Sequence, residues 1–362
     1  MSTTKRIEYI DALRGFTMIL VVAVHIYSYC FMQLKVEEYD LSYNNFFGLF
    51  RMPLFYFISG FVFYKYDRYW DYNTIKIFIT NKVRVQLIST LIFFLLFCWL
   101  FQRGIKHSLF DTQKAGYWFT YILFIYFILY IGIDKTICWI GKKKAFNNFT
   151  IIVSFIVGLI IYYITNNDDD LLKIFTINNA TLFSVIRWQY FIFFSFGCFI
   201  HKYYDDFLKF QNIKYIRGGI LSVFVGCSIC IFYLNRNETI THNYILKLLT
   251  AIFGIMLVFF LFKENESNLS STTKLGNCLQ YIGKHTLDIY FLHYFFLPYN
   301  MSYIGRWLDL YPNPLLEFCI SLTFALIVIV LCLLVSKIIR LSPTLTYLLF
   351  GGAKTKSDNL KL

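Results

Sequence analysis

The stretch YIDALRGFTMILVVAVHIYSYCFM, residues 9–32, is a long apolar run that nevertheless contains Arg14 and His25. A run of this length is typical of a helix that crosses a membrane, where ionisable side chains are rare and mark functional sites. Eleven residues of helix turn through about 1,100°, which is about 20° past three full turns. Arg14 and His25 therefore project from the same side of one helix, and we expect them to serve one site.

The composition of the whole chain predicts a membrane protein. Of its 362 residues, 58% are hydrophobic and only 15% are charged, whereas soluble domains average about 25% charged residues. Long apolar runs recur along the chain, and only helices or closed barrels satisfy the backbone in lipid. We predict an all-α polytopic bundle of about ten transmembrane helices. Their expected limits are 11–32, 43–64, 85–102, 117–133, 148–165, 182–200, 217–234, 244–262, 279–297 and 314–336.

Basic residues between the predicted spans indicate the orientation of the chain. If the N-terminus is cytoplasmic, most of the 34 Lys and Arg residues fall on the cytoplasmic side, whereas the acidic run 168–170 falls outside. We therefore expect both termini in the cytoplasm and the protein in the cytoplasmic (inner) membrane of a cell. This asymmetry explains the net charge of +13, so that a nucleic-acid partner is not required.

No soluble domain is predicted, because the connections between spans are too short to form one. We treat residues 1–342 as a single transmembrane domain and residues 343–362 as a cytoplasmic C-terminal tail. The closest pair of cysteines, Cys227 and Cys230, lies inside a predicted span with no second pair or nearby His, so we expect no metal site. The sequence leaves the oligomeric state open, a homo-oligomer included.

The second predicted span brings another cation to the depth of His25. Arg51 lies about 12 Å below the outer end of its span, and His25 lies about 10 Å below the outer end of the first. Desolvation and a nearby guanidinium both disfavour a charged imidazole, so His25 is expected to be neutral and able to accept a proton. An intramembrane Arg costs about 2.5–3.5 kcal/mol or more and needs a partner. Asp11 serves Arg14, whereas Arg51 has no acid in its span and is expected to bind an oxyanion or phosphate.

Each of these residues also has a structural interpretation. Arg14, near the cytoplasmic end of its span, can extend its charge to the membrane surface. His25 can simply hydrogen-bond a neighbouring helix. Glu317 lies in the first turn of the tenth predicted span, just after Pro314, where an acid favours the helix dipole, and we interpret it as structural.

Three motifs together resemble those of a known family. The stretch DALRG, residues 11–15, followed by His25, resembles the opening signature of the membrane-bound acyltransferase 3 family. The stretch FRMPLFYFISGF, residues 50–61, resembles the family's second signature. Near the end of the chain, IGKHTLDIYFLH, residues 282–293, is similar to its late helix, with Thr286 where Ser is usual. The stretch GYWF, residues 116–119, resembles a weaker mid-chain motif of the same family.

The resemblance implies an enzyme, an O-acyltransferase. Such proteins move an acyl group, usually acetyl, from cytoplasmic acyl-CoA to a hydroxyl of an extracytoplasmic or lipid-linked glycan. By this resemblance His25 is the essential histidine, and Arg14 and Arg51 are the accompanying functional arginines. The implied partners are membrane lipid, acetyl-CoA or another acyl-CoA as co-substrate, and the glycan acceptor. A bacterial cell membrane and a role in polysaccharide modification are the expected setting.

Further residues complete the expected site. The phosphates of acyl-CoA favour a basic entrance beside Arg14, for which the candidates are Lys5, Arg6, Lys82 and Arg84. Secondary candidates are Asp11, Tyr290, His293 and Trp118. Tyr290 and His293, three residues apart on one helix, either line the acceptor side or join helices by hydrogen bonds.

The main alternative function is transport. A transporter or exporter of a glycan or lipid, without acyl-transfer chemistry, would also use intramembrane Arg and His. Inverted repeats, or helices broken by Gly and Pro in matching halves, would favour it. The sequence shows neither.

Overall fold

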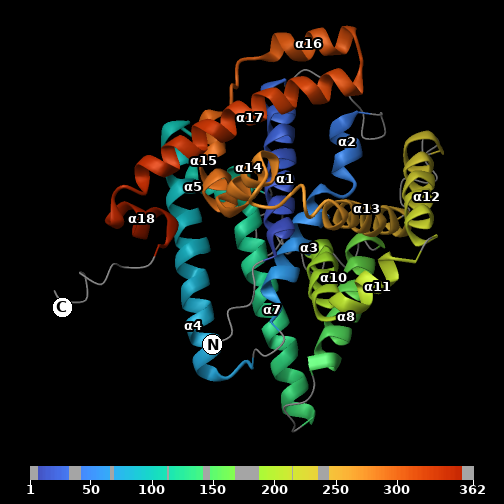
Figure 1. Cartoon of the computed structure of the whole chain (residues 1–362). Helices are drawn as coiled ribbons and strands as arrows, with labels where there is room; N and C mark the ends of the chain where they lie inside the picture. Colours follow the sequence, from blue (N-terminus) through green and yellow to red (C-terminus); the bar gives the residue numbers. More distant parts are fainter. Residues whose placement is uncertain are drawn as a thin grey trace, which may run out of the picture. The chain divides into compact units, whose positions relative to one another are not determined.

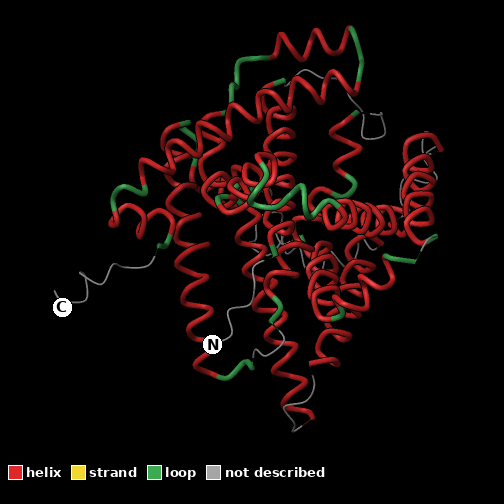
Figure 2. The backbone as a smooth tube through the Cα atoms, in the orientation of Figure 1, coloured by secondary structure: helices red, strands yellow, loops and turns green. Residues whose placement is uncertain are grey.

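Figure 1 shows the computed structural model of the chain, in which the described residues are 7–31, 42–65, 69–111, 114–141, 147–167, 187–213, 215–234 and 244–352. Every regular element within these residues is a helix, and none of them is in a strand (Figure 2). The prediction of an all-α fold is therefore confirmed.

Eight helical segments of the described residues are long and apolar enough to cross a membrane, so the chain is a membrane protein. The count of about ten is not confirmed. The predicted span 182–200 lies partly outside the described residues, and its described part holds only a 3-10 turn and most of a 12-residue helix. The candidate spans are Glu8–Cys30, Tyr43–Phe63, Tyr72–Leu100, Trp118–Ile140, Phe149–Asn166, Ile216–Tyr233, Tyr244–Glu264 and Pro314–Ile339.

The chain forms two compact units. The first unit comprises Met1–Ile58 and Tyr203–Cys332, and the second comprises Ser59–Lys202 and Leu333–Leu362. Two helices begin in the first unit and end in the second, namely α3 (Arg51–Phe63) and α17 (Pro314–Ile339). The other helices of the first unit are α1 (Glu8–His25), η1 (Ile26–Cys30), α2 (Tyr43–Gly48), α11 (Tyr204–Gln211), α12 (Ile216–Ile229), η5 (Cys230–Leu234), α13 (Tyr244–Glu264), α14 (Lys274–Lys284), α15 (Thr286–Phe296) and α16 (Ser302–Leu310).

The second unit is held together by aromatic side chains. Phe63 stacks on Phe127 with ring centroids 5.0 Å apart, and both rings contact Phe194. Such aromatic pairs stabilise a core beyond the area that they bury. Its helices are α4 (Tyr72–Lys82), η2 (Val83–Ile88), α5 (Ser89–Leu100), α6 (Ile105–Phe110), η3 (Lys114–Gly116), α7 (Trp118–Gly141), α8 (Asn147–Asn167), η4 (Trp188–Tyr190), α10 (Phe191–Lys202) and α18 (Pro343–Phe350).

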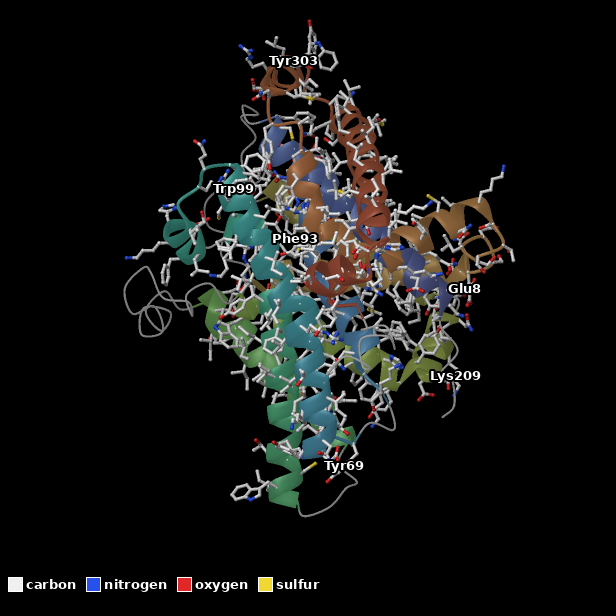
Figure 3. The ribbon with its side chains drawn as sticks, turned by 90° about the vertical axis from the view of Figure 1, so that its left-hand side faces the viewer. Glu8, Tyr69, Phe93, Trp99, Lys209 and Tyr303 are labelled. Carbon is white, nitrogen blue, oxygen red and sulfur yellow. The ribbon has the colours of Figure 1, made fainter. Side chains whose placement is uncertain are left out.

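Part of the predicted C-terminal tail is an ordered helix of the second unit. Helix α18 begins at Pro343, and the Ser342 side chain caps it by accepting from the Leu345 N–H. It ends at Gly351, which adopts the left-handed conformation. Phe350 of α18 is buried and stacks on Phe93 of α5, the residue labelled in Figure 3.

Helix α1 carries the site and is buried along most of its length. Glu8 and Asp11 in its first turn favour the positive end of the helix dipole. The Glu8 carboxylate, at the outer edge of the view in Figure 3, accepts hydrogen bonds from the backbone N–H and the hydroxyl of Ser271. These bonds tie the start of α1 to the segment that leads into α14.

Two glycines let α14 approach the backbone of α1. A Cβ atom on Gly15 would overlap the carbonyl oxygen of Leu279, and one on Gly283 would overlap the carbonyl oxygen of Asp11. Small residues at such crossings are typical of helices packed in membranes. Both glycines belong to motifs singled out in the sequence, and the close crossing gives the physical reason for them.

The predicted span 279–297 is two helices rather than one. Along α14, Leu279 faces Gly15 and Gly283 faces Asp11, so residue numbers run opposite to those of α1. Along α15, residue numbers run the same way as those of α1, because Thr286 contacts Arg14 and His293 contacts His25. The chain therefore turns back at His285, between the two helices.

Helix α1 changes character immediately after His25. Residues Ile26–Cys30 form the π-helical turn η1, with hydrogen bonds spaced one residue further apart. Such π-turns are frequent at functional sites. The second candidate span is also interrupted, because α2 ends at Gly48 and α3 begins at Arg51. Both irregularities lie next to predicted site residues.

Candidate active site

The centre of the candidate site is a pair of histidines from α1 and α15 of the first unit. Nδ1 of His25 lies 2.9 Å from Nε2 of His293, although the two residues are 268 positions apart in sequence. Their rings are nearly parallel, with an interplanar angle of 15°. The pair joins a predicted essential residue to a predicted secondary one.

Hydrogen bonds around the pair assign its protons. Nδ1 of His293 lies 3.0 Å from the carbonyl oxygen of Ile289, which can only accept, so this nitrogen carries the proton. Nε2 of a neutral His293 is then an acceptor, and Nδ1 of His25 donates to it. The remaining nitrogen of His25, Nε2, is left with a lone pair. This tautomer is the one that a proton-accepting histidine needs.

A tyrosine hydroxyl faces the lone pair of His25. The hydroxyl of Tyr294 lies 3.2 Å from Nε2 of His25 and can donate to it. His293 is fully buried, whereas His25 is only partly buried. Within the pair, His25 is therefore the accessible member and His293 the supporting one. Tyr290, by contrast, lies beside His293, with ring centroids 6.2 Å apart.

Arg51 lies near this pair, as the depth estimate predicts. Its positive charge acts on the His25 ring and on the hydroxyl of Tyr43. One of its guanidinium nitrogens is buried. A cation fixed beside a partly accessible imidazole can stabilise negative charge that develops on a reacting oxygen.

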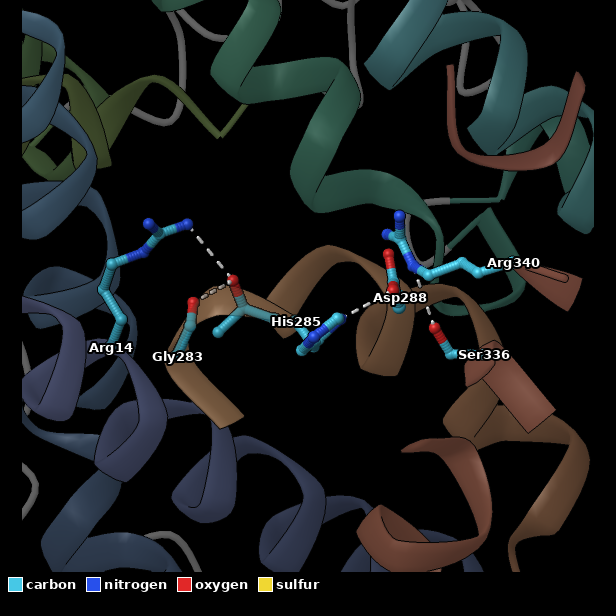
Figure 4. Close-up of polar contacts among 7 residues, drawn as sticks. Arg14, Gly283, His285, Asp288, Ser336 and Arg340 are labelled. Carbon is cyan, nitrogen blue, oxygen red and sulfur yellow. Dashed lines mark hydrogen bonds and ion pairs between the residues drawn. The ribbon is translucent and has the colours of Figure 1, made fainter. Parts of the chain in front are cut away.

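Arg14 forms a second polar group at the other end of α1. Its guanidinium donates a hydrogen bond to the Thr286 hydroxyl, at 3.2 Å (Figure 4). The guanidinium also lies 3.8 Å from the Asp11 carboxylate. The expected ion pair with Asp11 is present, and the Arg14 side chain keeps 31% of its surface exposed. Arg14 is thus a partly exposed guanidinium, a group that recognises phosphate and carbonyl oxygens.

The turn between α14 and α15 contributes a side-chain hydrogen bond beside Thr286. Nδ1 of His285 lies 3.0 Å from the Asp288 carboxylate, and the two side chains are drawn together in Figure 4. The Thr286 hydroxyl also donates to the Gly283 carbonyl. The start of α15 is thus fixed by short-range polar contacts, which hold Thr286 in place to receive Arg14.

Three of the predicted residues do not belong to the first unit. Trp118, Lys82 and Arg84 belong to the second unit. There, the Arg187 guanidinium lies 4.1 Å above the Trp118 ring, Lys82 lies 4.8 Å above Phe127, and Arg84 lies 5.2 Å above Tyr347. The role of all three in the site remains a prediction. Lys5 and Arg6 lie outside the described residues.

Sequence reasoning missed Tyr294 and the partnership between His25 and His293. Spacing along one helix cannot reveal partners that lie on helices far apart in the chain. Tyr294 directly follows His293 in the sequence. Its hydroxyl could have indicated a role in the site, since a buried Tyr usually directs its hydroxyl to a polar partner. Thr286 was noted only as a departure from a motif, yet its hydroxyl binds Arg14.

A comparison with known protein families gives a match over most of the chain. The acyltransferase 3 family, described as an acyltransferase domain, matches residues 7–334 and so includes α1, α14, α15 and most of α17. Neither the curated proteins nor the solved structures contain a match to the chain. The match covers most of the sequence and contains both polar groups of α1. The chain belongs to the acyltransferase 3 family.

Proposed function

We propose that this protein is a membrane O-acyltransferase. It takes an acyl group, in the first instance acetyl, from acyl-CoA and transfers it to a hydroxyl of an extracytoplasmic or lipid-linked glycan. Membership of the acyltransferase 3 family supports acyl transfer in general. The observation that carries the mechanism is the bond between His25 and His293, which leaves the other nitrogen of His25 as an acceptor.

The proposed reaction uses His25 as general base and then as general acid. Nε2 of His25 accepts the proton of the glycan hydroxyl while the hydroxyl oxygen attacks the thioester carbonyl. The carbonyl oxygen becomes an oxyanion, which the charge of Arg51 stabilises. When the carbon–sulfur bond breaks, the proton on Nε2 passes to the departing sulfur and gives the free thiol of CoA. No proton is gained or lost overall.

Arg14 is the proposed contact for acyl-CoA. Eleven residues of helix separate Arg14 from His25, a rise of about 16 Å. An extended pantetheine arm can cover that length while its phosphates stay near the charged end. Lys5, Arg6, Lys82 and Arg84 are proposed to add to this basic entrance, which we place on the cytoplasmic side together with both termini.

The acceptor reaches His25 from the opposite side in this proposal. Beyond His25, η1 leads to Phe31, the last described residue before the segment that precedes α2. A glycan hydroxyl arriving there meets the lone pair of His25 without passing the charged end of α1. A bacterial cell membrane is the proposed location, and the polysaccharide or lipid-linked sugar is the proposed substrate.

The test is a transfer assay with the purified protein in lipid vesicles. Vesicles receive acetyl-CoA with a radiolabelled acetyl group and a surface polysaccharide as acceptor, and the label in the acceptor is measured. We expect label to enter the acceptor as an ester that mild base releases. Uptake of the glycan into the vesicles without any transfer of label would instead support a transporter and contradict the proposal.

A further inference from the structure

A buried carboxylate lies in the first turn of α17, outside the two polar groups of α1. Glu317 is only 6% exposed, and one of its oxygens accepts a hydrogen bond from the backbone N–H of Tyr43, at 3.4 Å. The Tyr27 hydroxyl is near the same carboxylate, but the two groups do not meet the geometric criteria of a hydrogen bond. An acid that only favours the helix dipole would gain by staying in water. The burial of Glu317 therefore points to a specific partner.

That partner, Tyr43, connects α17 to the end of α1. The Tyr43 hydroxyl donates to the carbonyl oxygen of Ala23, at 2.8 Å, and the side chain is almost fully buried. Its ring packs edge-to-face on Tyr27, with centroids 5.5 Å apart, and against Phe318 at 5.6 Å. Glu317 thus fixes the backbone of Tyr43, and Tyr43 fixes the backbone of α1 two residues before His25.

The Ala23 carbonyl lies where α1 changes from an α-helix to the π-turn η1. The N–H of Ile26 is shared there between the carbonyls of Ala23 and Val22, so the last α-helical hydrogen bond is bifurcated. The π-turn that follows has a wider hydrogen-bond spacing than the α-helix. The Tyr43 hydroxyl is a second donor to the Ala23 carbonyl at this junction. The direction of the His25 side chain depends on this boundary between α1 and η1, because His25 is the last α-helical residue.

We propose that Glu317 and Tyr43 are positioning residues for His25. The Glu317 carboxylate holds Tyr43, and the Tyr43 hydroxyl holds the turn that aims Nε2 of His25 at the acceptor hydroxyl. This inference rests on the proposed function, since it assigns a role within the same reaction. Loss of the Tyr43 hydroxyl leaves the Arg14 end of α1 intact. It therefore lowers kcat and leaves the KM for acetyl-CoA unchanged.

The first experiment compares Tyr43→Phe with Tyr126→Phe. Tyr126 is a matched control, because it is fully buried and its hydroxyl donates to a backbone carbonyl, that of Arg187, in the second unit. We expect both variants to lower the melting temperature by similar amounts. Only Tyr43→Phe should lower kcat, by about 10-fold to 100-fold, with KM for acetyl-CoA within about twofold. An unchanged kcat for Tyr43→Phe, or an equal fall for both variants, would overturn the inference.

The second experiment asks whether Glu317 acts as a hydrogen-bond acceptor. The side-chain oxygen of Glu317→Gln can still accept from the Tyr43 N–H, whereas Glu317→Leu offers no acceptor. We expect Glu317→Gln to keep most of the wild-type kcat and Glu317→Leu to lose as much as Tyr43→Phe. Loss of activity in Glu317→Gln would mean that the charge itself is needed and would overturn a positioning role. A fully active Glu317→Leu would overturn it too.

The two proposals fail in different ways. If the wild-type protein transfers no acetyl group, the proposed function fails. If the wild type transfers acetyl, and Tyr43→Phe and Glu317→Leu transfer it equally fast, the function stands and only the positioning role fails. The combined variant Tyr43→Phe with Glu317→Leu should lose no more than Tyr43→Phe alone, since both changes break one chain of contacts.

Discussion

The two ends of α1 carry polar groups of opposite character. At one end Arg14 is charged, one-third exposed and held by looser contacts, at 3.2 Å to Thr286 and 3.8 Å to Asp11. At the other end, Nδ1 of His25 lies 2.9 Å from Nε2 of the fully buried His293. His293 in turn is hydrogen-bonded to the Ile289 carbonyl. A partly exposed positive charge suits the binding of an anionic ligand, whereas a neutral imidazole with a lone pair suits proton transfer. In the proposed mechanism, acyl-CoA binding and proton transfer are therefore separated along a single helix.

One short helix, α15, serves both ends. Thr286, at the start of α15, accepts a hydrogen bond from Arg14. His293, two turns later, is hydrogen-bonded to His25. The turn back at His285 makes this possible, because α15 then runs in the same direction as α1. In the proposed mechanism, α1 and α15 together therefore set the distance between the acyl-CoA contact and the base.

The largest effect is expected from the chemical end. His25→Ala removes the proposed base and should lower kcat about 10²–10⁴-fold, because a single general base contributes about that much. The variant should remain folded, and His107→Ala, at an exposed histidine of α6, serves as the control. Transfer at the wild-type rate by a stable His25→Ala protein would remove His25 from the mechanism.

Arg51→Lys sharpens the role of the cation beside His25. Lysine keeps the charge but loses the planar fork of guanidinium donors. We expect kcat to fall about 10²-fold, as on removal of one oxyanion donor. Steady-state kinetics with acetyl-CoA and glycan measure this, and an unchanged kcat would make Arg51 a structural residue.

Gly283→Ala is expected to disturb the contacts of α1 with α15 at both Arg14 and His25. Its new methyl group would meet the backbone of α1 at Asp11, so α14 and α15 must shift together. Overpacking of this kind costs about 1–3 kcal/mol, which should appear as a lower melting temperature in detergent. Gly132→Ala, in α7 with open space around its Cα, is the control. Equal melting temperatures for the two variants would contradict the close crossing.

Arg14→Gln tests the binding end alone and should have the smallest effect on the chemistry. Loss of a charged donor to the phosphates should raise the KM for acetyl-CoA about tenfold and change kcat little. Arg306→Gln, at an exposed position of α16, is the matched change. A fall in kcat with an unchanged KM for acetyl-CoA would contradict a binding role for Arg14 and would indicate a role in the chemical step.

Much of the fold follows from the sequence, but the break at His285 does not. Hydrophobicity alone treats 279–297 as one span. The close approach of Gly15 and Gly283 to opposing backbones, however, fixes α14 against α1 in the opposite direction. The polar residues Lys284, His285 and Asp288 were the sign of a turn, since a continuous span would place them in lipid.

The candidate site was predictable only in part. The pairing of Arg14 with Asp11, and the approach of Arg51 to His25, follow from spacing and depth along the helices. The bond from His25 to His293 does not, because the partners are distant in sequence and meet only through tertiary packing. The π-turn after His25 and its contact with Tyr43 leave no mark in the hydropathy pattern either.

The kcat of two variants at His293 decides whether this residue prepares His25 for proton transfer. Gln at this position offers a side-chain oxygen that can accept the Nδ1 proton of His25, whereas Leu offers none. We predict that His293→Gln keeps kcat within about tenfold of the wild type and that His293→Leu loses about 10²-fold or more, since a wrong tautomer disables the base. Equal rates for the wild type, His293→Gln and His293→Leu would contradict the claim that His293 prepares His25 to accept a proton.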